Sequence, residues 1–302
     1  MTQTAGLGSD ADGGGGYRGA SVAAVRQHYD AGNEFYQLWL DPTFTYSCAM
    51  WEEDEPDGAL ETAQVRKLDF HIHQARAHAK DRVLDIGCGW GSLLRRLVET
   101  HGVKKAVGLT LSAAQAEWLG RRHHPRIEVR EENWFHHEPA ELYGSILCVA
   151  ALEAFARPGL AEHEKIMAYR SLFERCHGWL EPGGWMSLQT VAWGNTRGAN
   201  SSGFIETKIF PDSDLPTLSE LAKALERTFE VVALRNDRQD YARTCRVWLS
   251  RLRALRSAAR DVVGADVVAR YETYLKMAWI GFHTGKLDLL RITVRRIDSR
   301  WS

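Results

Sequence analysis

Short apolar runs alternate with helical patterns along most of the chain. Runs of branched and other apolar residues predict strands at 83–86, 106–110, 127–130, 144–149 and 185–190. Apolar residues at helical spacing predict helices at 59–79, 92–100, 112–122 and 163–180. Because parallel strands need a crossover connection, this alternation predicts an α/β fold with a doubly wound, mostly parallel sheet. Such sheets bind ligands at the carboxyl ends of their strands.

The pattern changes in the C-terminal part of the chain. A polar stretch at 193–208 and a helical segment at 217–228 precede a strand at 229–234. Long helices are predicted over 245–283, and a last strand at 289–294 is expected to be antiparallel. With no internal repeat, we expect one domain over residues 19–302. Its helical cover would come from three segments, about 19–80, 195–228 and 245–283.

Composition agrees with a globular protein and limits its partners. The 302 residues are 44% hydrophobic, which is enough for a large core. The net charge of −1 gives no global field for nucleic acid or an anionic membrane. No apolar run approaches the roughly 18 residues of a membrane span. We therefore expect no nucleic-acid partner and no stable membrane insertion, whereas the oligomeric state does not follow from the sequence.

Residues 1–18 are polar and rich in glycine, without the apolar segment of a signal peptide, so we expect a disordered tail. The five cysteines are scattered and never form a C-x-x-C pair, which indicates a reduced, cytoplasmic protein without structural zinc. Two histidine pairs, His123-His124 and His136-His137, have no carboxylate or cysteine at metal-ligand spacing. We expect both pairs on the surface and no metal site.

A glycine-rich turn follows the first predicted strand, in the stretch Leu84-Asp85-Ile86-Gly87-Cys88-Gly89-Trp90-Gly91. Its three glycines permit positive φ and a close approach of a ligand to the backbone. The helix that follows offers free N–H groups at its start. Asp85 is placed to orient the loop or to bind a cationic group. A tight turn without a ligand is the alternative interpretation.

The second strand separates two classes of nucleotide site. In dinucleotide-binding sheets an acidic residue near the end of this strand binds a ribose. Here the strand ends Gly108-Leu109-Thr110, and Ser112, which suits a helix N-cap, and Gln115 follow. The missing carboxylate argues against a nicotinamide cofactor. The spacing of Asp85 and the glycines fits D-x-G-x-G-x-G, the nucleoside-binding loop of class I methyltransferases.

Further motifs extend this likeness over residues 25–294. They are Tyr29-Asp30 with Phe35-Tyr36, Thr45-Tyr46-Ser47-Cys48-Ala49, the glycine stretch, Gly108-Leu109-Thr110-Leu111-Ser112 with Gln115, Ile209-Phe210-Pro211 with Leu215-Pro216, and Tyr241-Ala242-Arg243-Thr244. With them the chain resembles the cyclopropane fatty acid synthase family of S-adenosylmethionine-dependent methyltransferases, especially its mycolic-acid-modifying branch. That family also includes plant benzylisoquinoline N-methyltransferases. The resemblance implies a Rossmann-like class I methyltransferase fold with a helical lid over an apolar acceptor pocket.

The resemblance also implies roles for the candidate cofactor residues. The methionine part of S-adenosylmethionine would be held by Tyr46, Ser47, Gly87, Gly89 and Gly91, with Asp85 beside them. Thr110 and Gln115 would contact the ribose side. Trp134, preceded by Asn133, would cover the adenine, and the alternative for Trp134 is a place in the core.

The catalytic candidates contain two departures from the family pattern. Cys48, Glu153 and Tyr241 fall where cyclopropane synthases hold a bicarbonate ion that acts as base. The family's Glu-His pair reads Glu153-Ala154 here, and the usual Leu-His-Thr of the fifth strand reads Leu188-Gln189-Thr190. Glutamine can hydrogen-bond, but it cannot take up and carry a proton near neutral pH. A complete bicarbonate cage would therefore need Gln189 as its remaining member.

Each catalytic candidate also has a structural alternative. Cys48 could be a small buried hydrophobic residue, and Glu153 could face the dipole at a helix N-terminus. Tyr241 could pack with a satisfied hydroxyl. Gln189 could be a strand residue with a backbone hydrogen bond.

Transfer of a sulfonium methyl group needs in-line attack by an electron-rich carbon or nitrogen, so the enzyme chiefly positions reactants and excludes water. Attack by an alkene leaves a carbocation, which aromatic faces stabilise. The candidate rings are Tyr46, Trp51, Trp193 and Tyr241. A base must then remove a proton, and Glu153, acting directly or through Tyr241 or a bound anion, is the candidate at the strand ends.

Three enzymatic hypotheses follow, and one that is not enzymatic. The first is a methyltransferase that forms a C–C bond on an alkene or another electron-rich carbon of a lipid-like or specialised acceptor, without ring closure because the proton-handling residues are altered. The second is a cyclopropane synthase, and the third is an N-methyltransferase of a small amine. A silent cofactor-binding protein is disfavoured, because it would not need Cys48, Glu153 and Tyr241 together.

Overall fold

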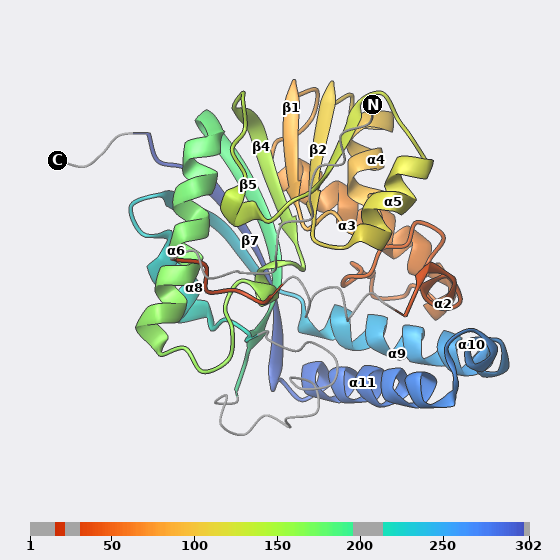
Figure 1. Ribbon diagram of the computed structural model, residues 1–302. Helices are drawn as coiled ribbons and strands as arrows, with labels where there is room; N and C mark the ends of the chain where they lie inside the picture. Colours follow the sequence, from red (N-terminus) through yellow and green to blue (C-terminus); the bar gives the residue numbers. More distant parts are fainter. Residues whose placement is uncertain (1–15, 22–30, 196–213, 299–302) are drawn as a thin grey trace, which may run out of the picture.

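The computed structural model describes residues 16–21, 31–195 and 214–298. Tyr29-Asp30, Ile209-Phe210-Pro211 and nearly all of the predicted tail lie outside these residues. Within them one sheet has the strand order β3-β2-β1-β4-β5-β7-β6 (Figure 1). The strands are β1 Arg82–Ile86, β2 Lys105–Thr110, β3 Ile127–Glu131, β4 Tyr143–Val149, β5 Leu180–Trp193, β6 Phe229–Asn236 and β7 Leu287–Arg296.

The pairing of the strands confirms the predicted fold class. All neighbouring strands are parallel except where β7 pairs with β5 and β6, and both of those pairs are antiparallel. The last strand is therefore antiparallel, as expected, and it lies inside the sheet. β5 is longer than predicted because β7 pairs with it as far as Trp193, opposite Leu287.

Helices cover both faces of the sheet. On one face lie α3 Leu60–Gln74, α4 Ser92–Glu99 and α5 Ala113–Arg121, and on the other lie α6 Glu162–Trp179 and α8 Leu218–Leu225. The start of α5 is set by Ser112, whose hydroxyl accepts a hydrogen bond from the Gln115 N–H, as expected of an N-cap. Thr217 and Glu220 form a capping box at the start of α8.

A third group of helices lies at one end of the sheet (Figure 1). It contains α2 Asn33–Gln37, α9 Arg238–Ala254, α10 Arg256–Val263 and α11 Ala265–His283. These helices share an apolar cluster with the 39–51 loop, centred on buried aromatic residues such as Trp39 and Trp248. Short 3₁₀ turns occupy Asp57–Ala59 (η1), Trp134–His136 (η2) and Leu152–Ala154 (η3).

The helical cover differs from the prediction in two respects. It begins at Arg238, seven residues before the predicted 245, so that Tyr241 lies within α9. The described part of the 195–228 segment, α8, packs against α6 and β6 and does not join the group of α9 to α11. The reason is the apolar face of α8, where Leu221 and Leu225 are buried in the same cluster as Phe229.

The expectation that His136-His137 is a surface pair is wrong for His137. Its side chain is fully buried, with Nδ1 3.2 Å from a Glu132 carboxylate oxygen and Nε2 3.0 Å from the Tyr143 hydroxyl. A buried imidazole needs partners for both nitrogens. Here the carboxylate and the phenol supply them, and neither follows from local sequence spacing.

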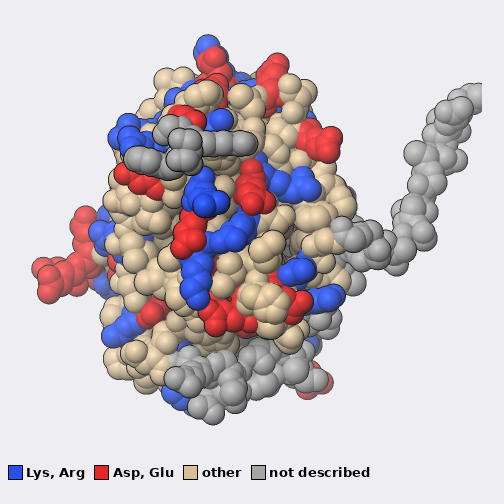
Figure 2. Space-filling view, turned by 90° about the vertical axis from the view of Figure 1, so that its left-hand side faces the viewer, with Lys and Arg blue, Asp and Glu red and all other residues tan. Residues whose placement is uncertain are grey.

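The surface and the edge strand complete the description. Figure 2 shows one face on which basic and acidic side chains are interspersed, so that neither sign forms a patch there. Within the described residues no helix combines the length and hydrophobicity that crossing a bilayer would require.

β6 forms one edge of the sheet, and its pairing with β7 shifts register between Val231 and Ala233, which leaves Val232 as an extra residue in the strand.

The layered core predicts a contrast between two substitutions. Leu84 is fully buried in β1 between two parallel neighbours, whereas Val232 is 48% exposed on the edge strand. We expect Leu84→Ala to lower the free energy of unfolding by about 2–5 kcal/mol, through lost burial and a cavity. Val232→Ala should change it by about 0.5 kcal/mol or less. Urea denaturation measures both, and equal losses would contradict this picture of the core.

Candidate active site

The glycine loop between β1 and α4 is a tight backbone cradle. Gly87, Gly89 and Gly91 all have positive φ, at 81°, 55° and 82°. A Cβ at Gly87 would lie 2.4 Å from the Ala151 Cβ, and one at Gly91 would lie 2.3 Å from a Leu119 methyl carbon. The first and third glycines are therefore required by their positive φ and by the space that Ala151 and Leu119 occupy.

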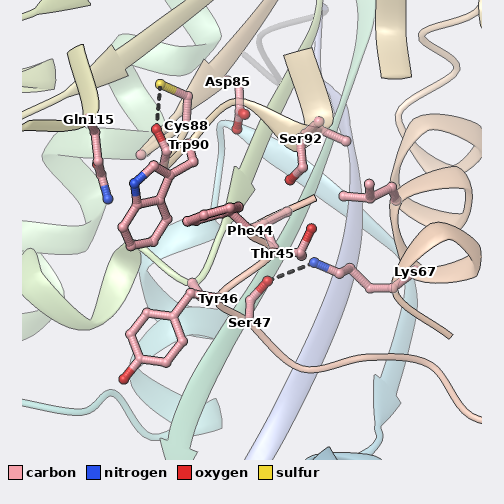
Figure 3. Close-up of a pocket in the computed structure, with 16 residues that line it drawn as sticks. Phe44, Thr45, Tyr46, Ser47, Lys67, Asp85, Cys88, Trp90, Ser92 and Gln115 are labelled. Carbon is pink, nitrogen blue, oxygen red and sulfur yellow. Dashed lines mark hydrogen bonds between the residues drawn. The ribbon is translucent and has the colours of Figure 1, made fainter. Parts of the chain in front are cut away.

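A pocket opens beside this loop, with about 480 Å³ of space between its walls when the open solvent at its mouth is included (Figure 3). The Phe44–Ser47 loop, the glycine loop, α3, α5 and the residues after β4 line it. Six of the predicted cofactor residues belong to the lining, namely Tyr46, Ser47, Asp85, Gly87, Gly89 and Gln115. Gly91, Thr110, Asn133 and Trp134 are not part of it.

One side of the pocket carries a buried lysine. Lys67 of α3 donates to the Ser47 hydroxyl at 2.6 Å, and Gln64, one turn earlier, donates to the Ser47 carbonyl at 2.8 Å. Burial, followed by the positive charge of Arg291, lowers the pKa of Lys67 to about 7. Burial raises the pKa of Asp85 to about 7, against the opposing effect of Lys67. Burial thus favours the neutral form of both groups, and a zwitterionic ligand could offset that cost.

Gln115 lies on the opposite side of the pocket from Lys67 (Figure 3). Its Oε1 accepts a hydrogen bond of 2.7 Å from the Thr110 hydroxyl. Its Nε2 is buried and has no hydrogen-bond partner among the described residues. A buried amide N–H without a partner costs free energy unless a ligand accepts from it, and a ribose hydroxyl is such an acceptor. Gln115 thus offers a donor to the pocket, whereas Thr110, which does not line the pocket, holds the Gln115 amide.

Trp134 is packed more tightly than a simple adenine cover would be. It is 5% exposed, and its ring lies 5.1 Å from that of Phe155 and 6.0 Å from that of Tyr17, centroid to centroid. Asn133 caps the 3₁₀ turn by accepting from the Phe135 N–H. Both residues therefore have structural roles, and the Trp134 Nε1 has no hydrogen-bond partner among the described residues.

Of the predicted catalytic residues, Cys48, Gln189 and Tyr241 are buried, and Glu153 is partly buried with a buried Oε2. Burial raises the pKa of the Tyr241 hydroxyl, and the groups that add to this effect include Cys48 and Glu153. Cys48 is fully buried, its thiol donates to the Ala49 carbonyl, and burial raises its pKa to about 12. A thiol with this pKa is neutral near pH 7 and is no nucleophile.

Glu153 completes the strand ladder where β4 ends. Val149 is the last residue of β4 paired with β5, opposite Gln189. On β5, two residues after Gln189, the Val191 N–H donates to Glu153 Oε1 at 2.7 Å. Glu153 Oε2 is buried and has no hydrogen-bond partner among the described residues, and burial raises the pKa of this carboxyl to about 7. One oxygen therefore holds the backbone and the other can accept a proton.

Comparison with known proteins shows which family the chain belongs to. Residues 18–292 match the family described as mycolic acid cyclopropane synthetase. The chain belongs to this family. It is 31% identical to cyclopropane mycolic acid synthase 1 of Mycobacterium tuberculosis, over 91% of this chain and 97% of that protein. It is 33% identical to cyclopropane mycolic acid synthase 2 of Mycobacterium leprae, over 89% and 90% of the two chains.

Solved structures of cyclopropane synthases agree with the family assignment. The crystal structure of CmaA1 complexed with SAH and CTAB has a TM-score of 0.82 and 30% identity, and the match covers 91% of this chain and 98% of that one. The structure of the cyclopropane synthase MmaA2 from Mycobacterium tuberculosis has a TM-score of 0.80 and 30% identity to this chain. Coclaurine N-methyltransferase, at 20% identity, shares the fold. The prediction of an S-adenosylmethionine-dependent methyltransferase is confirmed.

In this family member, sequence reasoning missed three buried polar residues. Lys67 and His71 of α3 and Arg291 of β7 are all less than 3% exposed. Arg291 Nη2 donates to the Ala49 carbonyl at 3.0 Å and lies 3.5 Å from Cys48 Sγ. A signal existed for the first two. With Gln64, they recur at helical spacing on the apolar face of the predicted 59–79 helix.

Backbone strain also marks the pocket. Phe44 and Ala150 line it, and both have positive φ, at 59° and 56°. Residues other than glycine pay about 1 kcal/mol or more for this conformation. Such strain persists where the surroundings enforce it, commonly at functional sites. The sequence contains no signal for it at either residue.

The glycine cradle predicts a selective loss of cofactor affinity. In Gly87→Ala the new methyl group must displace either Ala151 or the loop, so we expect binding of S-adenosylmethionine to weaken at least about tenfold. Gly120→Ala is the control, because a Cβ there meets no atom within 4 Å. Isothermal calorimetry on folded protein measures both. Unchanged affinity in Gly87→Ala would contradict the assignment of this loop.

The raised pKa of Glu153 predicts a pH-dependent gain in stability for Glu153→Gln. Between its ordinary pKa near 4.5 and about 7, the native state keeps a proton that the unfolded state has lost, so stability falls as pH rises. Glutamine avoids this loss and still accepts from Val191. The gain should therefore be larger at about pH 8 than at about pH 5.

Glu162→Gln is the matched control for this prediction. Its ion pair with Lys223 holds the pKa of Glu162 below the ordinary value, so the substitution should bring no gain at high pH. Chemical denaturation at both pH values makes the comparison. A pH-independent effect of Glu153→Gln would contradict the raised pKa.

Proposed function

We propose that the protein transfers the methyl group of S-adenosylmethionine to a double-bonded carbon of an unsaturated, lipid-like acceptor, and that the product is methyl-branched. The observation on which this rests is the buried Oε2 of Glu153, a proton acceptor without a partner in a member of this family. Relatives named for mycolic acid, and a CmaA1 structure with CTAB, support a lipid-like acceptor.

The pocket beside the glycine loop fits the cofactor. Lys67 is the cation for its carboxylate, Asp85 is the anion for its ammonium group, and Gln115 is the donor for its ribose. S-adenosylmethionine supplies an electrophilic methyl group on a sulfonium. The chain's own task is to hold the acceptor carbon in line and to exclude water, because methyl transfer itself needs no acid.

Attack by the alkene forms one C–C bond and leaves a cation on the neighbouring carbon. Tyr46 and Tyr241 are the aromatic candidates for stabilising it. Trp51 is less suited, because its ring faces the Arg243 guanidinium at 4.3 Å and its N–H donates to Thr244. Trp193 is less suited for a similar reason, because its N–H donates to Asp214. The cation then loses a proton to Glu153 Oε2, which forms a new double bond.

The choice between a branch and a ring depends on which proton leaves. Loss from a carbon of the acceptor gives a methyl-branched alkene, and loss from the transferred methyl group closes a cyclopropane. The family's histidine is replaced by Gln189, which accepts no proton, and this favours the branch. The alternative is a cyclopropane synthase in which Gln189 helps to hold bicarbonate. No observation in the structure favours a small-amine acceptor.

A deuterium experiment separates the two products. Purified protein is incubated with S-adenosylmethionine that carries a CD₃ group and with vesicles of dioleoylphosphatidylglycerol. A methyl branch retains all three deuterons and a ring retains two, so mass spectrometry and NMR of the released chains distinguish them. Ring formation would overturn the proposed product.

The same assay tests the base. Glu153→Gln should lower the rate by about 10²–10⁴-fold, because the proton acceptor is lost, while calorimetry shows unchanged binding of S-adenosylmethionine. Glu162→Gln is the surface control. Full activity in Glu153→Gln would exclude this carboxylate as the base.

A further inference from the structure

His71 links the α3 helix to β5 in a way that the proposed mechanism does not use. Its imidazole is fully buried, with Nδ1 2.8 Å from the Ser187 hydroxyl and Nε2 3.4 Å from Gln189 Oε1. Ser187 and Gln189 are two residues apart on β5, so both side chains face α3. Gln189 is itself fully buried.

The two partners determine the tautomer of this histidine. Gln189 Oε1 can only accept, so Nε2 must carry the proton and donate. Burial, together with the charges of Arg291 and Lys67, lowers the pKa of His71 well below its ordinary value, so the ring is neutral. A neutral ring has one N–H, and Nδ1 must therefore accept from the Ser187 hydroxyl. The hydroxyl can donate in this direction at 2.8 Å.

The tautomer of His71 and the orientation of the Gln189 amide therefore depend on each other. With Oε1 bound to His71, Nε2 is turned away from that bond, and it is buried without a hydrogen-bond partner among the described residues. A half-turn of the amide would exchange donor for acceptor. With the Nε2–H tautomer the turned amide would place two donors face to face, so a half-turn requires the Nδ1–H tautomer, in which Nδ1 donates to the Ser187 hydroxyl.

Gln189 also belongs to the layer of predicted catalytic residues. It pairs directly with Arg291 of β7, whose Nη2 lies 3.5 Å from Cys48 Sγ. Its carbonyl accepts from the Ala150 N–H just after β4. Glu153 binds the β5 backbone two residues further along, at Val191. An N–H donor fixed at Gln189 is thus available to an oxygen atom held in this layer.

We infer that His71 is a positioning residue, which holds the Gln189 amide with its N–H donor directed into the catalytic layer. The inference rests on the proposed function for the reaction that this donor serves. It assigns to α3 a histidine that acts on the β5 position where the family pattern has its own histidine. His71 itself touches neither cofactor nor acceptor and transfers no proton.

Two variants separate positioning from packing. His71→Gln keeps an amide N–H that can donate to Gln189 Oε1, whereas His71→Leu is of similar size and has no donor. We expect His71→Leu to lower kcat about tenfold on dioleoylphosphatidylglycerol vesicles with an unchanged KM for S-adenosylmethionine. His71→Gln should restore kcat to within about threefold of wild type. In a Gln189→Leu background the two variants should be equal, because the partner is gone.

The tautomer gives a second, independent readout. Long-range ¹H–¹⁵N NMR of protein labelled at histidine should show the Nε2–H form of His71 in the wild type, and the same form when S-adenosylhomocysteine is bound. An Nδ1–H form would overturn the inference, and so would equal kcat for His71→Leu and His71→Gln. Failure of the wild type to methylate the vesicles would count against the proposed acceptor alone, since the NMR result decides the orientation without turnover.

Discussion

The buried polar face of α3 is the constraint on which the site depends. Gln64, Lys67 and His71 lie along one side of this helix, among apolar residues that pack on the sheet. Each must find a partner in the interior, because an unpaired buried polar group is costly. Gln64 and Lys67 find theirs in the loop that contains Ser47, and His71 finds its partners on β5. One helix thereby joins the Phe44–Ser47 loop beside the pocket to β5.

The sequence was sufficient to predict the architecture. Apolar residues alternate between the spacing of strands and that of helices, and with short connections this leaves few ways to build a sheet. Strand and helix positions agree with the prediction, and Ser112 caps its helix as expected. The exceptions are the length of β5, the start of the cover and the packing of α8. Those features depend on which apolar face meets which partner over long sequence separations, and periodicity alone does not choose the partner.

The site was predictable where chemistry is local. Gly87, Gly89 and Ser47, which belong to two separate motifs, line one pocket. What the sequence did not reveal is how polar residues from distant segments satisfy one another, as Arg291 does with the Cys48–Ala49 backbone and His71 does with Gln189. His71 and Gln189 are in contact although they lie 118 positions apart in the sequence. The physical reason is that a buried polar group needs a hydrogen-bond partner, and the partner that lies beside it in the folded interior need not be near it in the sequence.

The bulge at Val232 has a consequence for how this molecule meets its own copies. β6 ends the sheet with exposed Val231, Val232 and Leu234, a composition that would otherwise invite another chain to add a strand. The extra residue breaks the regular spacing of N–H and C=O groups that such addition needs, and Glu230 and Arg235 place charges on either side of it. The protein can therefore leave an apolar edge in water while disfavouring the growth of fibrils from it.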